Sequence, residues 1–383
     1  MNCIGILTLN GYFNYGNRLQ NYALQELIKQ LGFECETILN STDLKKQENT
    51  VVKSSLQIFM EKNLKGKMNM ICYKINKDSI EKCKKDRHDL FVNFSKKYIK
   101  ETEFSISINH IPEDLGNKYS YFISGSDQVW NPNDSMVSEI NFMTFAPRCK
   151  RLTYAPSFGV SKIPQQYKED YKCWLEGIDN ISVREQEGAK IIKDLTGNDA
   201  LVVVDPTMLL TKEQWLSISK KHDNKPNKKY LLTYFLGGIS KEVNKKIKKI
   251  AKQNNLKVVN LATLKDKKYY ATGPSEFIDY INDASLFMTD SFHGCVFSVL
   301  LETPFVVCDR LGHTKEQNMS SRIETFLEKF QLQSRTFDRV TDEILFEKNY
   351  IEANEILEIE RKISWDYLKE VLEIRKDYDC IIN

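Results

Sequence analysis

Residues 286–294 read Leu286-Phe287-Met288-Thr289-Asp290-Ser291-Phe292-His293-Gly294, and this segment is the most informative one in the chain. Its apolar beginning predicts a short buried strand, its small and polar residues predict a tight turn, and the apolar run 295–301 predicts a buried helix. Such a turn lies at the carboxyl end of a strand, where open α/β sheets bind ligands. We therefore expect an α/β fold with a site at His293.

A histidine at a strand-to-helix turn suits proton-coupled chemistry on an anionic substrate. The imidazole exchanges protons near neutral pH, and backbone amides at a helix start attract phosphate or carboxylate. The alternative is that His293 only hydrogen-bonds the backbone of a buried turn. This segment alone does not separate the two interpretations.

The composition limits the classes of protein to consider. A chain of 383 residues is long enough for two domains, and a net charge of +3, from 55 basic and 52 acidic residues, argues against nucleic-acid binding. The nine cysteines include no C-x-x-C pair, which favours reduced thiols in a cytoplasmic protein over a disulfide framework or a zinc site. We expect no metal and no cofactor.

The amino terminus resembles a first strand because it lacks both a basic leader and a long apolar stretch. No segment approaches the roughly 20 apolar residues of a spanning helix. We therefore expect a soluble, cytoplasmic protein without a transmembrane segment. Its lysine-rich helical patterns leave peripheral membrane association open.

Strand and helix patterns alternate in both halves of the chain, which predicts two Rossmann-like lobes with parallel sheets. Polar residues 220–229 are expected to link them. The predicted division is 1–222 for the first lobe, with a helical insertion at about 41–100, 228–353 for the second lobe, and 354–383 for a helix that could cross back to the first lobe. Predicted strands cover 4–9, 33–39, 119–123, 151–155, 180–183, 200–204, 230–236, 256–261, 285–289 and 304–308.

Three polar segments near predicted strand or helix ends are candidates for binding an anion. The loop 10–18 supplies Asn17 and Arg18 at a helix start, but it is neither G-x-G-x-x-G nor a Walker loop. Arg184 follows a strand, and its guanidinium suits carboxylate or phosphate. Arg322 opens a later helix. A surface ion pair for Arg184 and a solvated first turn for Arg322 are the competing interpretations.

The segment 124–132 combines small hydroxyls, a carboxylate, an amide and an indole after another strand. Ser126, Asp127 and Gln128 could hydrogen-bond sugar hydroxyls, while Trp130 could stack on a sugar face. A capped turn with a core tryptophan explains the same residues. Together, the polar strand ends of both lobes predict a cleft between the domains.

The sequence resembles the polysaccharide pyruvyl transferase family. The resemblance rests on Gly16-Asn17 with Leu19-Gln20 and Tyr22-Ala23-Leu24, Ser124-Gly125-Ser126-Asp127-Gln128-Val129-Trp130, Ser182-Val183-Arg184-Glu185, Asp205-Pro206-Thr207, Thr289-Asp290-Ser291-Phe292-His293-Gly294 and Ser321-Arg322. It covers nearly the whole chain, and the motifs at Trp130 and His293 are its specific parts.

The resemblance implies a two-lobed fold similar to the glycosyltransferase-B fold. It also implies transfer of the pyruvyl group of phosphoenolpyruvate onto a sugar of a surface-polysaccharide precursor as a ketal, in bacteria. It makes His293 the candidate acid/base and Arg184 a candidate ligand for the donor. Some relatives have arginine where this chain has Ser291, so the donor site must recruit another cation or accept another donor.

We expect donor binding to involve Ser291, Gly294, Asn17, Arg18 and Arg322, and acceptor binding to involve the segment 126–130. The acceptor is expected to be a saccharide, with a lipid-linked form as one option. Two other functions remain open: a nucleotide-sugar glycosyltransferase of similar fold, and a sugar-binding or assembly protein that has lost catalysis.

Overall fold

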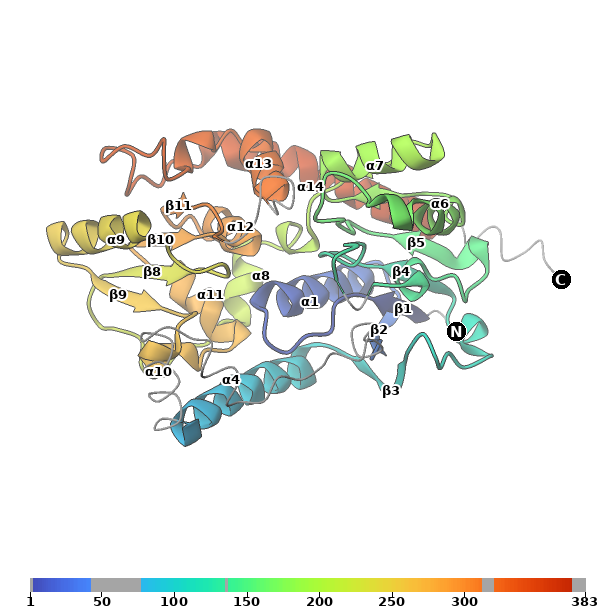
Figure 1. The fold of residues 1–383 in the computed structure, drawn as a ribbon, viewed down its shortest axis with the longest axis horizontal. Helices are drawn as coiled ribbons and strands as arrows, with labels where there is room; N and C mark the ends of the chain where they lie inside the picture. Colours follow the sequence, from blue (N-terminus) through green and yellow to red (C-terminus); the bar gives the residue numbers. More distant parts are fainter. Residues whose placement is uncertain (1–2, 43–76, 135–136, 312–319, 374–383) are drawn as a thin grey trace, which may run out of the picture.

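The computed structural model describes residues 3–42, 77–134, 137–311 and 320–373, which form two α/β lobes with parallel sheets (Figure 1). The five-stranded sheet of the first lobe has the order β3-β2-β1-β4-β5, and every neighbouring pair is parallel. Its strands are β1 (Cys3–Leu7), β2 (Glu34–Asn40), β3 (Glu101–Ile106), β4 (Tyr121–Ser124) and β5 (Arg151–Thr153). The predicted α/β class is confirmed.

Helices follow the strands of the first lobe, as crossover connections between parallel strands require. They are α1 (Tyr15–Gln30), α4 (Lys77–Tyr98), α5 (Leu115–Lys118), α6 (Lys168–Glu176), α7 (Gln186–Thr196) and α8 (Lys212–Ser217). A separate two-stranded parallel sheet pairs β6 (Ser182–Val183) with β7 (Leu201–Val202). Asn14 caps α1 by accepting a hydrogen bond from the Gly16 N–H at 2.9 Å, which sets where the helix begins.

The second lobe has a four-stranded parallel sheet in the order β11-β10-β8-β9. Its elements are β8 (Tyr230–Tyr234), α9 (Lys241–Gln253), β9 (Lys257–Asn260), α10 (Lys267–Tyr270), α11 (Pro274–Asn282), β10 (Leu286–Thr289), α12 (Phe292–Leu300), β11 (Phe305–Val307) and α13 (Ser320–Lys329). The central strand β10 and the helix α12 are buried throughout, as the apolar runs on both sides of the turn predict.

The predicted insertion at about 41–100 is described only in part. Its residues 43–76 lie outside the described residues, whereas α4 occupies the end of the insertion and lies along both lobes (Figure 1). Arg87 of α4 donates to the Tyr15 hydroxyl at 2.8 Å in the first lobe and to the carbonyls of Leu261 and Tyr270 in the second, at 3.2 and 2.8 Å. This buried guanidinium therefore ties α4 to both lobes.

The last described helix, α14 (Ile351–Glu373), runs from the second lobe to the first (Figure 1). Just before it, the Tyr350 hydroxyl donates to the Thr303 carbonyl of the second lobe at 2.6 Å. Near its other end, the Tyr367 hydroxyl donates to the Thr153 carbonyl of β5 at 3.1 Å, and Ser364 accepts the Val204 N–H at 3.0 Å. The chain thus returns to the lobe in which it began.

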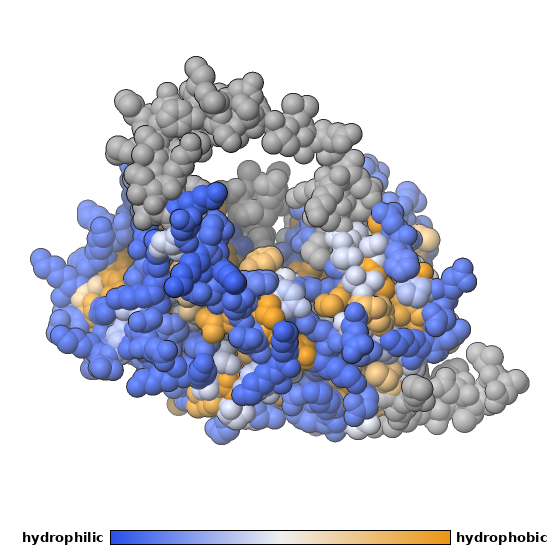
Figure 2. Space-filling model, turned by 90° about the horizontal axis from the view of Figure 1, so that it is seen from below, coloured by the Kyte–Doolittle hydropathy of each residue, from blue (hydrophilic) through white to orange (hydrophobic). Residues whose placement is uncertain are grey.

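One hydrophobic cluster contains buried residues from both lobes, and each lobe has a second cluster of its own. Tyr15 of α1 stacks on Phe277 of α11 with 4.1 Å between ring centroids and 9° between ring planes. Figure 2 shows mainly hydrophilic residues, with hydrophobic ones scattered among them, where grey atoms do not cover this face. Within the described ranges, we find no helix that combines the length and the apolar character needed to span a membrane.

Candidate functional site

Charged side chains from both lobes meet where the lobes join. The first lobe supplies Asp127 after β4, Arg184 after β6 and Asp205 after β7, while the second supplies His293 from the start of α12 and Arg322 from α13. All five residues are buried. The structure therefore brings four polar segments singled out in the sequence into one interlobe cluster.

Arg184 lies at the centre of this cluster, surrounded by carboxylates. Its guanidinium is 2.7 Å from Asp205 Oδ2, 3.4 Å from Asp127 Oδ1 and 3.9 Å from Glu185 Oε2. It also lies over the Phe292 ring, with Cζ 4.5 Å from the centroid. The surface ion pair considered from the sequence is therefore a buried network with more than one partner.

Asp205 connects Arg184 to the histidine. Its Oδ2 accepts hydrogen bonds from Arg184 at 2.7 Å and from the Ser126 hydroxyl at 2.8 Å, and lies 3.4 Å from His293 Nε2. Its Oδ1 accepts the Thr207 hydroxyl and N–H at 2.7 and 3.0 Å. Burial acts to raise the pKa of Asp205, but His293 and Arg184 outweigh it and hold that pKa well below its usual range.

This depressed pKa predicts a loss of stability in acid. The carboxylate of Asp205 titrates near pH 3.9 when unfolded and at a lower pH when folded, so its charge stabilises the fold above about pH 4. That contribution disappears as the pH falls from about 4 toward the folded pKa. We expect the Tm of Asp205→Asn to change less than that of the wild type between about pH 5 and 2. Equal slopes in thermal unfolding would contradict this.

The position of His293 depends on a glycine in the other lobe. The imidazole packs against Gly16 in the first turn of α1, where an added Cβ would overlap its Nδ1 and Cε1 atoms. On its other side, the ring meets Phe292 edge-on at 5.2 Å. The absence of a side chain at Gly16 therefore allows the histidine of one lobe to approach Asp205 of the other.

Gly16→Ala should consequently impair the site without removing an ionisable group. Alanine favours helices, so α1 itself should not be weakened, but its methyl group must displace the imidazole from Asp205. We expect activity to fall about tenfold or more, while the Tm changes by a few degrees at most. Gly32→Ala is a steric control because nothing lies within 4 Å of an added Cβ there, although its φ of +82° adds backbone strain. Full activity in Gly16→Ala would refute this account of His293.

Arg322 brings a second positive charge to the same place. Its Nη1 is 3.7 Å from Asp127 Oδ1, and its Nε is buried without a hydrogen-bond partner. Burial, reinforced by the like charge of Arg184, lowers the pKa of Arg322 to about 10, so it stays protonated at neutral pH. Arg184 Nε and His293 Nε2 are also buried and unpartnered. Three nitrogens of the cluster thus lack hydrogen bonds that a ligand could supply.

A small cavity adjoins the two arginines of the cluster, and His293 is not part of its lining. It measures about 20 Å³ and is lined by both arginines, Asp205, Phe292 and residues of α13. This is room for about one water molecule. The predicted cleft between the domains is therefore nearly closed here, and a substrate can reach the cluster only if surrounding groups move.

Two predicted site residues have structural roles instead. Arg18, expected at the donor, is fully buried and donates to Glu101 Oε1 and the Leu9 carbonyl, both at 2.7 Å. Trp130, expected to stack on the acceptor, is also fully buried, stacks on Phe142 at 4.9 Å and donates to the Asn141 carbonyl at 3.2 Å. Neither side chain can contact a ligand in this arrangement.

The turn before α12 also differs from expectation. Ser291 caps the helix, and its hydroxyl accepts the Gly294 N–H at 3.3 Å, so that amide is already engaged. A Cβ on Gly294 would approach Thr289 Oγ1 to 2.9 Å, which explains glycine there by close packing. Among the other predicted residues, Asn17 is buried with Oδ1 unpartnered, and Gln128 accepts from Asn131 at 3.2 Å.

Asp205 and Glu185 belong to the cluster, although neither is among the site residues predicted from the sequence. Glu185 accepts the Ser157 hydroxyl at 2.8 Å and the Phe158 N–H at 3.1 Å, and burial raises its pKa. The available signal was the position of Asp205 directly after a predicted strand. A second signal was the charged pair formed by Arg184 and Glu185 at another strand end.

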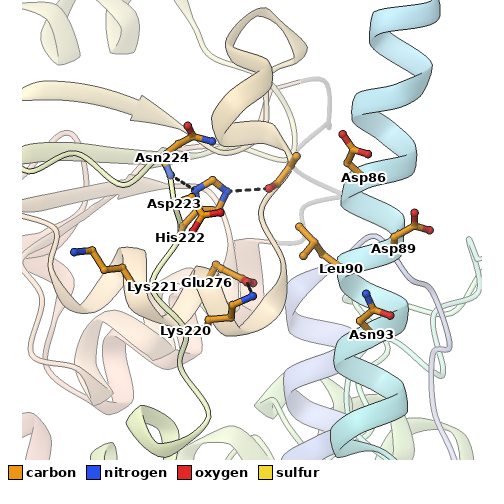
Figure 3. A pocket seen from close by; sticks show the side chains of 11 residues that line it. Asp86, Asp89, Leu90, Asn93, Lys220, Lys221, His222, Asp223, Asn224 and Glu276 are labelled. Carbon is orange, nitrogen blue, oxygen red and sulfur yellow. Dashed lines mark hydrogen bonds and ion pairs between the residues drawn. The ribbon is translucent and has the colours of Figure 1, made fainter.

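A larger pocket of about 320 Å³ lies between α4 and the linker (Figure 3). Its histidine, His222, accepts the Asn224 N–H at Nδ1, 3.0 Å away, and lies 3.0 Å from the Ala271 carbonyl through Nε2. Acidic residues outnumber lysines in its lining, which disfavours an anionic ligand. Among the described residues, we find no group of three or more His, Cys, Asp or Glu that could hold a metal ion.

Comparison with known proteins gives a family match. The model of the family described as "Polysaccharide pyruvyl transferase" matches residues 14–312. No curated protein gives a significant match.

Several solved structures align along nearly the whole chain. UDP-GlcNAc 2-epimerase from Neisseria meningitidis, bound to UDP-GlcNAc, is 9% identical over 97% of this chain and 100% of its own, with a TM-score of 0.43. S. aureus MnaA with UDP is 10% identical over 95% and 98%, with a TM-score of 0.45. The wall teichoic acid polymerase TagF is 11% identical over 98% and 90%, with a TM-score of 0.44.

Proposed function

Because this chain belongs to the polysaccharide pyruvyl transferase family, we propose that it transfers the pyruvyl group of phosphoenolpyruvate to a saccharide of a surface-polysaccharide precursor, forming a ketal and releasing phosphate. The observation that carries this proposal is the position of His293 Nε2, 3.4 Å from the buried carboxylate of Asp205 and in the same cluster as two arginines. A proton-transfer group and positive charge are the two features that this reaction requires.

The proposed reaction balances with one donor and two sugar hydroxyls. Protonation of the methylene carbon of phosphoenolpyruvate leaves C2 cation-like, and one hydroxyl adds there while losing its proton. Phosphate then leaves C2, a second hydroxyl takes its place to close the ketal, and the proton of that hydroxyl leaves with the phosphate. His293 first delivers a proton to the methylene carbon and then accepts the proton of the first hydroxyl, while Asp205 stabilises the imidazolium.

Arg322 is the cation that we propose in place of the arginine absent at Ser291. Its side chain lines the small cavity and its Nε has no hydrogen-bond partner. The guanidinium is held by a 3.7 Å ion pair with Asp127 and by the Phe292 ring, whose centroid is 5.9 Å from Cζ. Arg184 is held more firmly, by its 2.7 Å ion pair with Asp205, so we propose that its main role is to position the Asp205 carboxylate. Its Nε has no hydrogen-bond partner and would make a second contact with phosphoenolpyruvate. Donor entry requires the cavity to widen, because phosphoenolpyruvate is far larger than the present space.

The direct test is phosphate release from phosphoenolpyruvate in the presence of lipid-linked or nucleotide-linked sugars. We expect release only when an acceptor is present, and a product whose mass increases by that of a pyruvyl ketal. Turnover of a nucleotide sugar without phosphoenolpyruvate would instead establish a glycosyltransferase. Binding of sugars without turnover of either donor would indicate a protein that has lost catalysis.

A further inference from the structure

The first lobe contains a pocket of about 730 Å³ that is separate from the charged cluster. It lies beside α6, which Figure 1 shows on the outer part of this lobe near α7. The segments that form it are the turn after β3, the loop after β4 and the region around α6. Its lining residues are Ile108, Pro132, Asn133, Asp134, Val137, Ser138, Glu139, Pro164, Gln166, Tyr167, Asp170, Tyr171 and Trp174.

The pocket has an ordered aromatic wall. Tyr167 is 40% exposed, and Trp174 is partly exposed. The indole of Trp174 packs against Phe142 at 5.0 Å and Tyr171 at 5.3 Å, and the Tyr171 hydroxyl is fixed by a 3.0 Å hydrogen bond to the Trp130 carbonyl. The partly exposed ring of Trp174, held by the buried Tyr171 and Phe142, offers a flat apolar surface at little cost in conformational entropy.

The polar part of the lining consists of carboxylates and amides. Asp134, Glu139 and Asp170 supply carboxylate oxygens, while Asn133 and Gln166 supply amides. Among the described residues, the lining includes no lysine, arginine or histidine, so its carboxylates would repel phosphate or carboxylate groups. Aromatic faces beside hydroxyl-accepting oxygens instead suit a neutral polyhydroxylated ligand.

The pocket also lies toward the catalytic edge of its sheet. Ile108 comes two residues after β3, and Asn133 comes in the loop that begins with Asp127 after β4. Parallel strands end at one edge of a sheet, so both segments start from the edge at which Asp127 meets Arg184. Trp130, stacked on Phe142, connects that loop to the aromatic wall.

We infer that this pocket binds neutral sugar units of the saccharide acceptor, away from the unit that reacts at His293. The sequence predicts that Trp130 stacks on the acceptor sugar, but its ring is buried, and this pocket would bind the sugar instead. The identification of the bound sugar as the acceptor rests on the proposed function. The binding of a neutral oligosaccharide in this pocket does not depend on that function. The two sites differ in charge: the interlobe cluster provides arginines for an anionic donor, whereas the described lining of this pocket provides carboxylates and no arginine.

Binding of maltotetraose, cellotetraose and chitotetraose to the full chain tests this inference, by saturation-transfer NMR and titration. We expect at least one probe to bind, with Kd raised about tenfold by Tyr167→Ala and by Trp174→Ala. Trp365→Ala is the matched control, because Trp365 is also partly exposed but lies on α14. Circular dichroism and Tm measurements check folding, and the exposed Tyr167 keeps the test valid if Trp174→Ala is unstable.

Binding of none of the three probes, or equal Kd values in the wild type and Tyr167→Ala, would overturn the inference. A parallel titration with phosphoenolpyruvate separates it from the proposed function. Loss of oligosaccharide binding in Tyr167→Ala with unchanged phosphoenolpyruvate binding supports both. If the wild type binds an oligosaccharide in this pocket but does not use phosphoenolpyruvate, the pocket assignment stands and the proposed function fails.

Discussion

His293→Ala is expected to reduce phosphate release from phosphoenolpyruvate by about 10²–10⁴-fold, the usual contribution of a general acid/base. The imidazole is the only histidine side chain in the described interlobe cluster, and Asp205 lies 3.4 Å from its Nε2. Initial rates at saturating acceptor measure the effect. The protein should remain folded, because Asp205 keeps its hydrogen bonds from Arg184, Ser126 and Thr207 when the imidazole is removed.

The matched control for this prediction is His222→Ala. His222 is partly exposed and lies in the separate pocket of Figure 3, where both ring nitrogens contact the backbone. It should retain near wild-type rates. Activity retained in His293→Ala would remove the proposed acid/base role. Loss of the folded state would instead favour a histidine that only stabilises the buried turn.

Arg184→Ala is expected to destabilise the protein by about 3–5 kcal/mol, because it leaves buried carboxylates without their counter-charge. Asp205 is fully buried, and Asp127 and Glu185 lie within 4 Å of the same guanidinium. Denaturant unfolding monitored by fluorescence gives the free energy of unfolding. Arg184→Lys should recover part of the loss by restoring the charge without the planar fork.

Arg148→Ala provides the comparison for an exposed ion pair. Arg148 is 2.6 Å from Asp179, but both side chains are largely in solvent, so its removal should cost at most about 1 kcal/mol. Similar losses for Arg184→Ala and Arg148→Ala would show that the buried network contributes little. Since Arg184→Ala is expected to affect folding, Arg322→Ala is the better variant for measuring donor affinity.

Sequence patterns predicted most of the strands because buried strands of parallel sheets are continuous apolar runs. The segments at 286–289 and 305–307 show this clearly, and both are buried throughout. Strand β3 was not predicted because Glu101–Ile106 contains two glutamates and two other polar residues. It lies at the edge of the sheet, where one side is not covered by another strand and polar residues are tolerated.

Asp127, Arg184 and His293 each come shortly after a strand, so the parallel topology places each residue at the carboxyl edge of its own sheet. These strands belong to three different sheets, so the meeting of the three residues also depends on how the sheets pack together. The direction of a side chain does not follow from that placement. Arg18 was assigned to the donor because it is near a helix start, but its partner Glu101 lies on the strand that was not predicted. The indole of Trp130 could stack on a sugar, yet its ring is buried in the core of the first lobe.

The two helices that connect the lobes restrict how the interlobe cluster can open. Arg87 of α4 and the ends of α14 hold both lobes, and Figure 1 shows these helices along opposite margins of the molecule. A clamshell motion about one margin would have to break the contacts at the other. We therefore expect substrate admission by shear, with the lobes sliding past each other while both tethers stay in place.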